Sequence, residues 1–421
     1  MTSIRLTQEI PLRGSYDVVV CGGGVAGVGA ALSARRAGKR VLLLEKSLFL
    51  GGLATLGLIN FFVPMCNGRG RQIVTGLAEE LLRLSIRYGY DTLPAEWASG
   101  EPGPGAKTRY VTRFSANIFA LTLMEQLLDE GVELLLDTVV SSPLMESGHC
   151  RGLVVENKTG RGFYEAGMVV DATGDADVLV RAGVPTVLGQ NFFTYTAAGI
   201  TLDSCRRAAE SGRIQDALVN FSGGKATLYG QNQPVDEKLY AGVTAEEVSQ
   251  YVTRNQRLLL QSLKAQDRES REVVTLPGMA QLRTTRRIAG DYALTTADQY
   301  RHFEDSVGAI CDFDNRDFLY EVPLRTLCMD GFDNLLTAGR SAAATGYAWD
   351  VLRVIPPAIL TGQAAGTAAA QALDENKPVS RLNVGRLQAA LAAQGVLVHF
   401  PDELVPAKDA PQGERFDTGH I

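Results

Sequence analysis

The chain has 421 residues, of which 45% are hydrophobic and 21% are charged, an ordinary composition for a globular protein of about two or three domains. Its formal net charge of −6 argues against nucleic acid as a main partner. The four histidines and six cysteines show neither zinc-ligand spacing nor a C-x-x-C pair, so we expect no metal site and no redox dithiol. No apolar run reaches about 18 residues and the N-terminal segment lacks a signal-peptide core, so we expect a cytoplasmic protein without a membrane segment.

The most informative stretch begins near the N-terminus. An apolar run at residues 18–21 predicts a buried strand that ends at three glycines and passes into an Ala-rich helix. Gly22, Gly24 and Gly27 fit G-x-G-x-x-G, in which the glycines allow a tight turn, close approach to a pyrophosphate and close helix–strand packing. The helix N-terminus favours the negative charge of that pyrophosphate. The alternative is a glycine-rich turn in an unrelated α/β protein.

A second strand is predicted at residues 40–44. It ends in Glu45, which lies 23 residues after Gly22 and suits a carboxylate that binds a ribose hydroxyl. Strand, helix, second strand and acid therefore stand in the order of a dinucleotide-binding unit.

Helical elements and a loop follow. Apolar residues at helical spacing predict a helix over residues 72–88, and a region rich in Gly, Pro and Ala predicts a loop over 91–108. Ser115 and Gly131 are candidate N- and C-caps of a further helix.

The next elements are β-strands. A strand is expected at residues 132–136, and runs at 152–157 and 162–166 predict a hairpin or meander. Residues 168–171 predict a separate buried strand that ends in a Gly turn.

The pattern changes again near residue 191. A long polar helix is expected over 244–265 and no second nucleotide fingerprint appears, which indicates an inserted substrate domain. From residue 320 the chain returns to strand, turn and a Gly/Ala-rich helix that ends near residue 373. The predicted divisions are 1–190 and 321–385 for the two parts of a cofactor domain, 191–320 for the insert, and 386–421 for a C-terminal helix and tail.

Seven short segments carry a resemblance to a known family. They read GGGVAG (22–27), LLLEK (42–46), GGLATLG (51–57), VVDATGD (169–175), RTTRRIAGDY (283–292), DNLLTAGR (333–340) and GQAAGTAAA (362–370). Together they resemble FAD-dependent oxidoreductases of the glutathione-reductase-like superfamily, and more closely the broad family that shares GG-x-A-T-x-G and R-x-T-R-R-I-x-G-D-Y. The resemblance implies an α/β fold, with a Rossmann-like FAD-binding domain, a β-meander and an inserted α+β substrate domain.

The resemblance also implies which residues contact FAD. They are Gly22, Gly24, Val25, Ala26, Gly27, Glu45, Lys46, Gly51, Gly52, Leu53, Ala54, Thr55, Val139, Ala172, Thr173, Gly174, Gly339, Arg340 and Gln363. Thr55 is expected to hydrogen-bond the cofactor, Val139 to meet the adenine through its backbone, and the helix that contains Gln363 to aim its dipole at the flavin. Arg340 stands where many relatives carry an acid.

Catalytic candidates must place a substrate carbon near flavin N5 and move a proton. They are Arg353, Arg325, Arg283, Tyr347 and His302. Arg353 is the first candidate for flavin or substrate contact, with a helix anchor as the alternative. Arg283 either holds a substrate carboxylate or, with its motif neighbours, makes a structural ion pair with Asp291. His302 is a base or a surface histidine of the insert, and Cys66 is a buried thiol or, less readily, a flavin attachment point.

The predicted function is that of an FAD-dependent oxidoreductase which dehydrogenates or reduces a small organic substrate by hydride transfer at flavin N5. The missing second nucleotide fold and dithiol argue against a nicotinamide-linked disulfide reductase, so the flavin exchanges electrons with the substrate and an unknown acceptor. Two alternatives stay open: an oxidase or monooxygenase that uses O₂, and a scaffold protein with structural FAD. Family habit adds the expectation of a homodimer.

Overall fold

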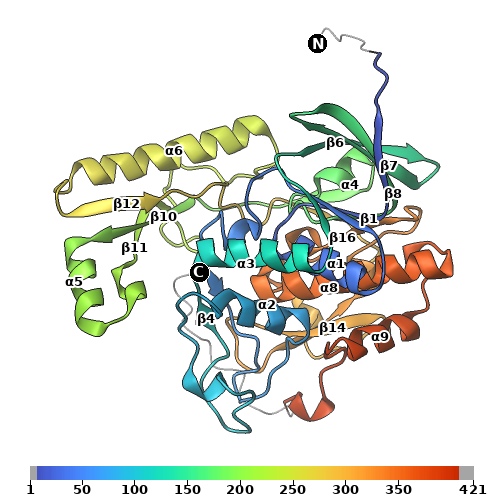
Figure 1. Ribbon diagram of the computed structural model, residues 1–421. Coiled ribbons are helices and arrows are strands. Elements are labelled where there is room, and N and C mark those ends of the chain that lie inside the picture. The colour runs from blue at the N-terminus through green and yellow to red at the C-terminus, as the bar shows by residue number, and fades with distance from the viewer. Residues whose placement is uncertain (1–6, 407–421) are drawn as a thin grey trace.

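The computed structural model describes residues 7–406, and a seven-stranded sheet forms its centre (Figure 1). Its strands are β1 (Leu12–Cys21), β2 (Val41–Leu44), β5 (Glu133–Leu135), β6 (Val139–Glu146), β7 (His149–Asn157), β8 (Gly160–Asp171) and β16 (Leu335–Thr337). The order is β5-β2-β1-β8-β7-β6, and β16 also pairs with β8. Strands β5, β2, β1, β8 and β16 pair in parallel, which confirms the predicted α/β class.

Strand β8 belongs to two arrangements at once. Its first half pairs antiparallel with β7 in the meander β6-β7-β8, and its last three residues pair in parallel with β16. The prediction of separate runs at 162–166 and 168–171 is therefore wrong, because Gly167 continues the strand. A Cβ at Gly167 would lie 2.8 Å from Leu373 and 3.0 Å from the Asp17 carbonyl, so this glycine allows close packing rather than a break.

Two helices, α1 (Val25–Arg36) and α8 (Ile355–Glu375), contact each other and the central sheet. Their backbones meet at glycines. A Cβ at Gly362 would lie 2.1 Å from the Ala26 carbonyl oxygen, and one at Gly366 would lie 2.2 Å from that of Ala30. The small residues of GQAAGTAAA thus let α8 lie directly against the helix that opens the nucleotide fingerprint.

Helices α2 (Leu77–Ile86) and α3 (Ala116–Asp129) pack together beside α1 and α8. Helix α2 begins five residues later than the predicted start at residue 72, because Gly76 adopts a φ of +68° that a helix does not accommodate. The caps of α3 are confirmed: the Ser115 hydroxyl accepts a hydrogen bond from the Ile118 N–H, and Gly131 adopts a φ of +76°.

A separate lobe, which we call the β10 lobe, projects to one side of the sheet (Figure 1). It contains β10 (Thr194–Thr201), β11 (Val219–Lys225), β12 (Arg271–Thr275), α5 (Leu202–Ser211) and α6 (Ala245–Lys264). The helix predicted over 244–265 is α6, and the Thr244 hydroxyl caps it. Tyr195 and Ala197 of β10 pack against Leu259 of α6, so strand alternation directs Thr194 and Thr196 to the opposite face.

The remaining elements connect the lobe to the sheet and close the chain. They are β3 (Phe61–Phe62), β4 (Thr112–Arg113), α4 (Asp177–Arg181), β9 (Thr186–Leu188), β13 (Arg286–Ile288), β14 (Ser306–Cys311), β15 (Leu319–Pro323), α7 (Tyr347–Arg353) and α9 (Val384–Ala393). The hairpin β14–β15 spans the boundary predicted at residue 320, and β14 contacts α8 and α9. The domain boundaries themselves stay predictions. Within residues 7–406, no helix is long and apolar enough to cross a membrane.

Candidate cofactor and substrate site

A pocket, here called the cofactor pocket, lies where β1 and β8 end, at the edge of a parallel sheet where α/β proteins bind ligands. It gathers fifteen of the predicted FAD contacts, and the catalytic candidate Arg353, from segments far apart in the sequence. The predicted residues in its lining are Gly22, Gly24, Val25, Ala26, Glu45, Lys46, Gly51, Gly52, Leu53, Ala54, Ala172, Thr173, Gly174, Gly339, Arg340 and Arg353.

The three fingerprint glycines have different surroundings. Gly22 adopts a φ of +103°, and a Cβ there would lie 2.5 Å from the Ala172 carbonyl oxygen. A Cβ at Gly27 would lie 1.8 Å from the Gly22 carbonyl oxygen, so Gly27 packs the helix onto the turn and is absent from the pocket lining. A Cβ at Gly24 would meet no protein atom within 4 Å. Gly24 therefore forms a bare cradle at the N-terminus of α1, which fits a pyrophosphate.

Glu45 holds the turn in place. One carboxylate oxygen accepts a hydrogen bond from the Gly23 N–H at 2.6 Å, and the other accepts from the Ser47 N–H at 2.7 Å and the Ser47 hydroxyl at 2.6 Å. The side chain ties the end of β2 to the glycine turn while it lines the pocket.

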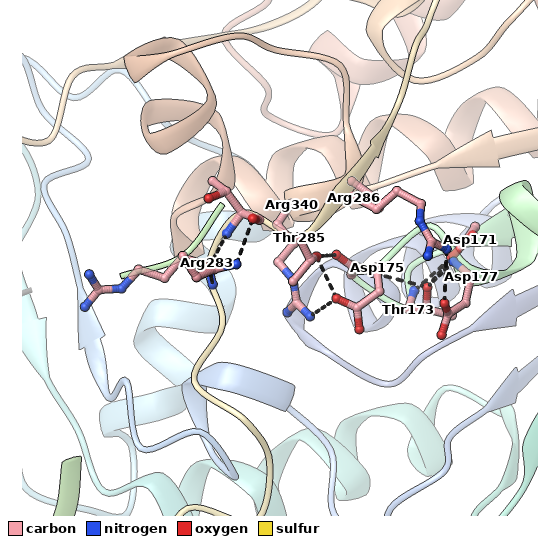
Figure 2. Close-up of polar contacts among 12 residues, drawn as sticks. Asp171, Thr173, Asp175, Asp177, Arg283, Thr285, Arg286 and Arg340 are labelled. Atoms are coloured by element: carbon pink, nitrogen blue, oxygen red, sulfur yellow. Dashed lines mark hydrogen bonds and ion pairs between the residues drawn. The ribbon is translucent and has the colours of Figure 1, made fainter. Parts of the chain in front are cut away.

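An ion-pair cluster lies beside the pocket (Figure 2). Arg340 donates to Asp175 at 2.8 Å, and the Thr285 hydroxyl donates to the same carboxylate oxygen at 2.7 Å. Burial alone would raise the pKa of Asp175, but the Arg340 charge and these hydrogen bonds outweigh it and hold that pKa below its usual value. Arg286 pairs with Asp177 at 3.5 Å. In Asp177, burial and the charge of Asp175 raise the carboxyl pKa.

The segment RTTRRIAGDY (283–292) thus has a largely structural part in the ion-pair cluster. Thr285 and Arg286 hold the acids that follow β8, and Arg286 pairs with Asp177 rather than with Asp291 as the structural alternative expected. Asp291 instead accepts a hydrogen bond from the Asp330 N–H.

Besides Gly27, three predicted cofactor contacts lie outside the pocket lining. The Thr55 hydroxyl donates to the Leu50 carbonyl at 2.5 Å and supports the loop from within. Val139 pairs with Glu156 at the edge of the meander and is 51% exposed. Gln363 faces α2 and α9, since it accepts from the Leu77 N–H at 2.9 Å and donates to Gln394 at 3.0 Å.

Two of the catalytic candidates lie at the pocket or beside it. Arg353 lines the pocket, its Nε donates to Asp350 at 2.7 Å, and its buried Nη2 forms an ion pair with the same Asp350 oxygen at 2.7 Å. Arg283 lines a neighbouring cavity, and Figure 2 shows its side chain extending away from the Asp175–Arg340 pair. Burial and the charge of Arg353 lower the pKa of Arg283 to about 10.

The other three candidates lie elsewhere. Arg325 pairs with Asp305 at 2.9 Å and lines, with His302, a different pocket beside the C-terminal helix. His302, predicted to belong to the insert, lies in the turn before β14 and contacts Glu321 of β15. Tyr347 donates to Asp312 at 2.7 Å, and burial together with that negative charge raises the pKa of Tyr347 well above its ordinary value.

The surroundings of His302 were not visible in the sequence. Its Nδ1 lies 2.5 Å from Glu321, its Nε2 lies 2.9 Å from Asp402, and His399 lies 3.0 Å from Glu321. The ligand-type atoms of His302, Glu321 and His399 all lie within 4.8 Å of one another. Because these residues are far apart in the chain, their spacing gave no signal. Distances of this length are those of hydrogen bonds between imidazole and carboxylate.

Cys66 is buried, accepts a hydrogen bond from the Tyr110 N–H at 3.2 Å and is absent from the cofactor-pocket lining. The pocket also contains residues that no motif marked. Gly278 and Met279 come from the loop between β12 and β13 and complete the lining from the side of the β10 lobe.

Comparison with known proteins adds a family and its relatives. The model of a family described as FAD dependent oxidoreductase matches residues 17–198 and 204–391. Digeranylgeranylglycerophospholipid reductase from Methanoculleus marisnigri is 28% identical over 189 residues, which are 42% of this chain and 43% of that protein. Thiamine thiazole synthase from Aeropyrum pernix is 28% identical over 176 residues, 39% of this chain and 57% of that protein. The match therefore spans only about half the length of these curated relatives.

Among solved structures, a geranylgeranyl bacteriochlorophyll reductase-like protein from Thermoplasma acidophilum is similar over 93% of this chain and 94% of its own, at 14% identity and a TM-score of 0.43. The L-proline dehydrogenase of P. horikoshii is similar over 92% and 100%, at 15% identity and a TM-score of 0.42.

Proposed function

Because the chain belongs to the FAD dependent oxidoreductase family, we propose that it uses FAD to dehydrogenate, or in reverse to reduce, a small organic molecule. FAD, when bound, supplies a hydride acceptor at flavin N5. The substrate thereby loses two electrons as a hydride and releases one proton, and an external acceptor later takes the electrons. The protein's own task is to hold the cofactor, orient the substrate and keep water away.

The residues present fit the cofactor. The bare face of Gly24 leaves space at the N-terminus of α1, where free N–H groups attract a pyrophosphate. One buried arginine atom in the lining, Arg340 Nε, has no hydrogen-bond partner among the described residues and can donate to an acceptor atom of the cofactor.

One observation carries the proposal of a substrate between the cofactor and the β10 lobe. The loop between β12 and β13 contributes Gly278 and Met279 to the cofactor pocket, and a few residues later Gln281 and Arg283 to a second cavity. One loop therefore contributes to the lining of both spaces. A substrate in the second cavity would lie next to the cofactor, with Arg353 between them as the residue we propose to orient it.

The test is the visible spectrum of the purified protein, followed by anaerobic titration with hydroxy acids, amines, sugars and cyclic alcohols. We expect FAD to be released on denaturation and one class of compound to bleach the bound flavin. Reoxidation within seconds in air, with H₂O₂ formed, would instead favour the oxidase alternative. Flavin that no compound bleaches would contradict catalysis and favour the scaffold alternative.

A further inference from the structure

The cavity beside the cofactor pocket has an unusual charge. Its lining includes Asn60, Arg113, Thr194, Thr196, Gln281 and Arg283, together with apolar residues and one further asparagine. Two of these side chains are cationic, and no aspartate or glutamate is among them. A small cavity that holds two guanidinium groups and no carboxylate attracts an anion.

Arg283 is the more deeply placed of the two arginines. Its backbone N–H donates to Asn191 at 2.5 Å, and Asn191 also accepts from the Thr284 N–H and donates to the Thr284 carbonyl, so the chain is held at this position. Its guanidinium, in contrast, makes no hydrogen bond or ion pair with any residue in 7–406. Figure 2 shows it extending away from the Asp175–Arg340 pair. Burial, and after it the positive charge of Arg353, lower the pKa of Arg283, and a bound anion would offset both effects.

Arg113 reaches the same cavity from β4. Its guanidinium carbon lies 5.0 Å from the centroid of the Phe61 ring, and Phe61 lines the cavity as well. Stacking on this ring holds the cation at the cavity wall without neutralising it. Within the described part of the chain, Arg113 has no acidic partner.

The cavity wall is preformed. The Gln281 side chain donates to the Gly57 carbonyl at 2.7 Å and to the Thr196 carbonyl at 2.9 Å, and accepts from the Thr196 N–H at 2.7 Å. Its amide is fully used in joining the loop after Gly52 to β10. Among residues 7–406, the hydroxyls of Thr194 and Thr196 make no hydrogen bond, so they can donate to a ligand from the face of β10 opposite α6.

We propose that the substrate carries an anionic group, a carboxylate or a phosphate, which Arg283 and Arg113 bind in this cavity. The inference rests on the proposed function, because it names the class of molecule presented to the cofactor. Guanidinium groups bind both anions through paired N–H donors, so the shared chemistry is that of an organic anion. Arg283 supplies the specific contact and Arg113 draws the charge in from the exposed side.

The experiment is a binding titration of the FAD-loaded protein, read by the perturbation of the flavin spectrum and by calorimetry. The probes are succinate, malate and glycerol 3-phosphate, with succinamide and glycerol as neutral counterparts. We expect one anionic probe to bind at least tenfold more tightly than its neutral counterpart, and binding to weaken at higher salt. Arg283→Met and Arg113→Met should each weaken that binding at least tenfold. Arg257→Met, an exposed arginine of α6, is the matched control and should leave it unchanged.

Each outcome has a separate meaning. Anion binding that depends on Arg283, without flavin reduction by the panel of compounds, would support the anion site and count against dehydrogenation. Flavin reduction by a neutral compound, at equal rates in the wild type and in Arg283→Met, would support dehydrogenation and overturn the anion site. Equal affinity for anionic and neutral probes would also overturn it. An adequate fold of each variant is checked by its circular dichroism and its retained FAD.

Discussion

At the scale of single residues, a substitution at Gly24 can test cofactor binding separately from folding. We predict that Gly24→Val folds normally, because a Cβ at this position meets no protein atom within 4 Å, but retains FAD at least tenfold less well. The measurement is the ratio of flavin to protein absorbance after gel filtration. Gly385→Val is the control, since a Cβ there meets only Asn383 Oδ1 at 3.6 Å and lies in α9. A fully yellow Gly24→Val protein would contradict the assignment of the pyrophosphate site.

Arg353 has the strongest position among the catalytic candidates. We predict that Arg353→Met keeps its FAD but slows flavin reduction at least tenfold, a loss of about 1.4 kcal/mol of transition-state stabilisation. The reason is that Arg353 lines the cofactor pocket as a buried cation, which Asp350 holds in place through Nε and Nη2. Anaerobic stopped-flow absorbance measures the rate, with Arg257→Met as the control. An unchanged rate in Arg353→Met would remove this residue from the reaction.

Single residues also show which parts of the site a sequence motif can predict. The places of the fingerprint glycines in the turn after β1, and of Glu45 at the end of β2, were predictable because a tight turn and a strand end leave clear marks in the sequence. Their contact with FAD stays a prediction. Thr55, Val139 and Gln363 were expected at the cofactor and lie outside its pocket. A motif locates a loop or helix but does not say which side chains of it turn inward. The Thr55 hydroxyl, for example, is already taken by the Leu50 carbonyl.

At the scale of elements, regular periodicity and caps were reliable guides. Ser115 and Gly131 marked both ends of α3, and Thr244 marked the start of α6. Glycines were poor guides to element boundaries. Gly76 delays the start of α2 beyond the predicted residue 72, whereas Gly167 does not interrupt β8. A glycine is permissive, so its effect depends on tertiary neighbours that local sequence does not contain.

The close contact between α1 and α8 should depend on the glycines of α8. Gly366→Ala should lower the free energy of unfolding by about 1–3 kcal/mol, because the new methyl group would lie 2.2 Å from the Ala30 carbonyl oxygen and must push the helices apart. Gly385→Ala, a helical glycine without such a neighbour, should be neutral or slightly stabilising. Urea unfolding of both variants measures the difference. Equal stability of the two variants would show that α1 and α8 can move apart without lowering the free energy of unfolding.

The segment after α9 is held by a pH-dependent contact. Burial disfavours the charged form of His302, but hydrogen bonds and charges from Glu321 and Asp402 outweigh it and raise its pKa above the ordinary value. Glu321 is fully buried and also faces His399. A raised folded-state pKa contributes stability that is complete below the unfolded value near 6.5 and is lost as the pH rises through the folded value.

We therefore predict that His302→Gln lowers the melting temperature more at pH 6 than at pH 9. The gap between the wild type and the variant should narrow across that interval as the wild-type imidazolium loses its proton. Thermal melts at several pH values provide the measurement. Arg257→Met, which lies far from this contact, should give the same gap at every pH. A gap for His302→Gln that widens with pH would reverse the assigned sign.

At the scale of the whole molecule, Gln281 connects the β10 lobe to the cofactor side. Gln281→Ala leaves the Gly57 carbonyl and both backbone groups of Thr196 without this partner, and should cost about 1–3 kcal/mol. We predict faster hydrogen exchange in β10 and earlier protease cleavage in the lobe. Gln250→Ala, on the exposed surface of α6, is the control. Unchanged exchange in β10 would show that other contacts hold the lobe.

The overall layout was partly predictable for a physical reason. A βαβ unit and a meander are formed by segments adjacent in the sequence, so the part of the fold around the cofactor pocket could be predicted from local patterns. The anion-attracting cavity draws on Asn60, Arg113, Thr196, Asn220 and Gln281, five segments that only the tertiary fold brings together. The same limit applies to His302, whose partners come from β15 and the chain after α9.

The loop between β12 and β13, which walls both spaces, has a consequence for the energetics of filling them. If seating one molecule stiffens this loop, the second molecule has less disorder left to remove, and each raises the affinity of the other by the same factor. The total free energy of binding both molecules is then the same whichever of them binds first. Through this one loop, the affinity for the substrate would then depend on whether the cofactor is bound.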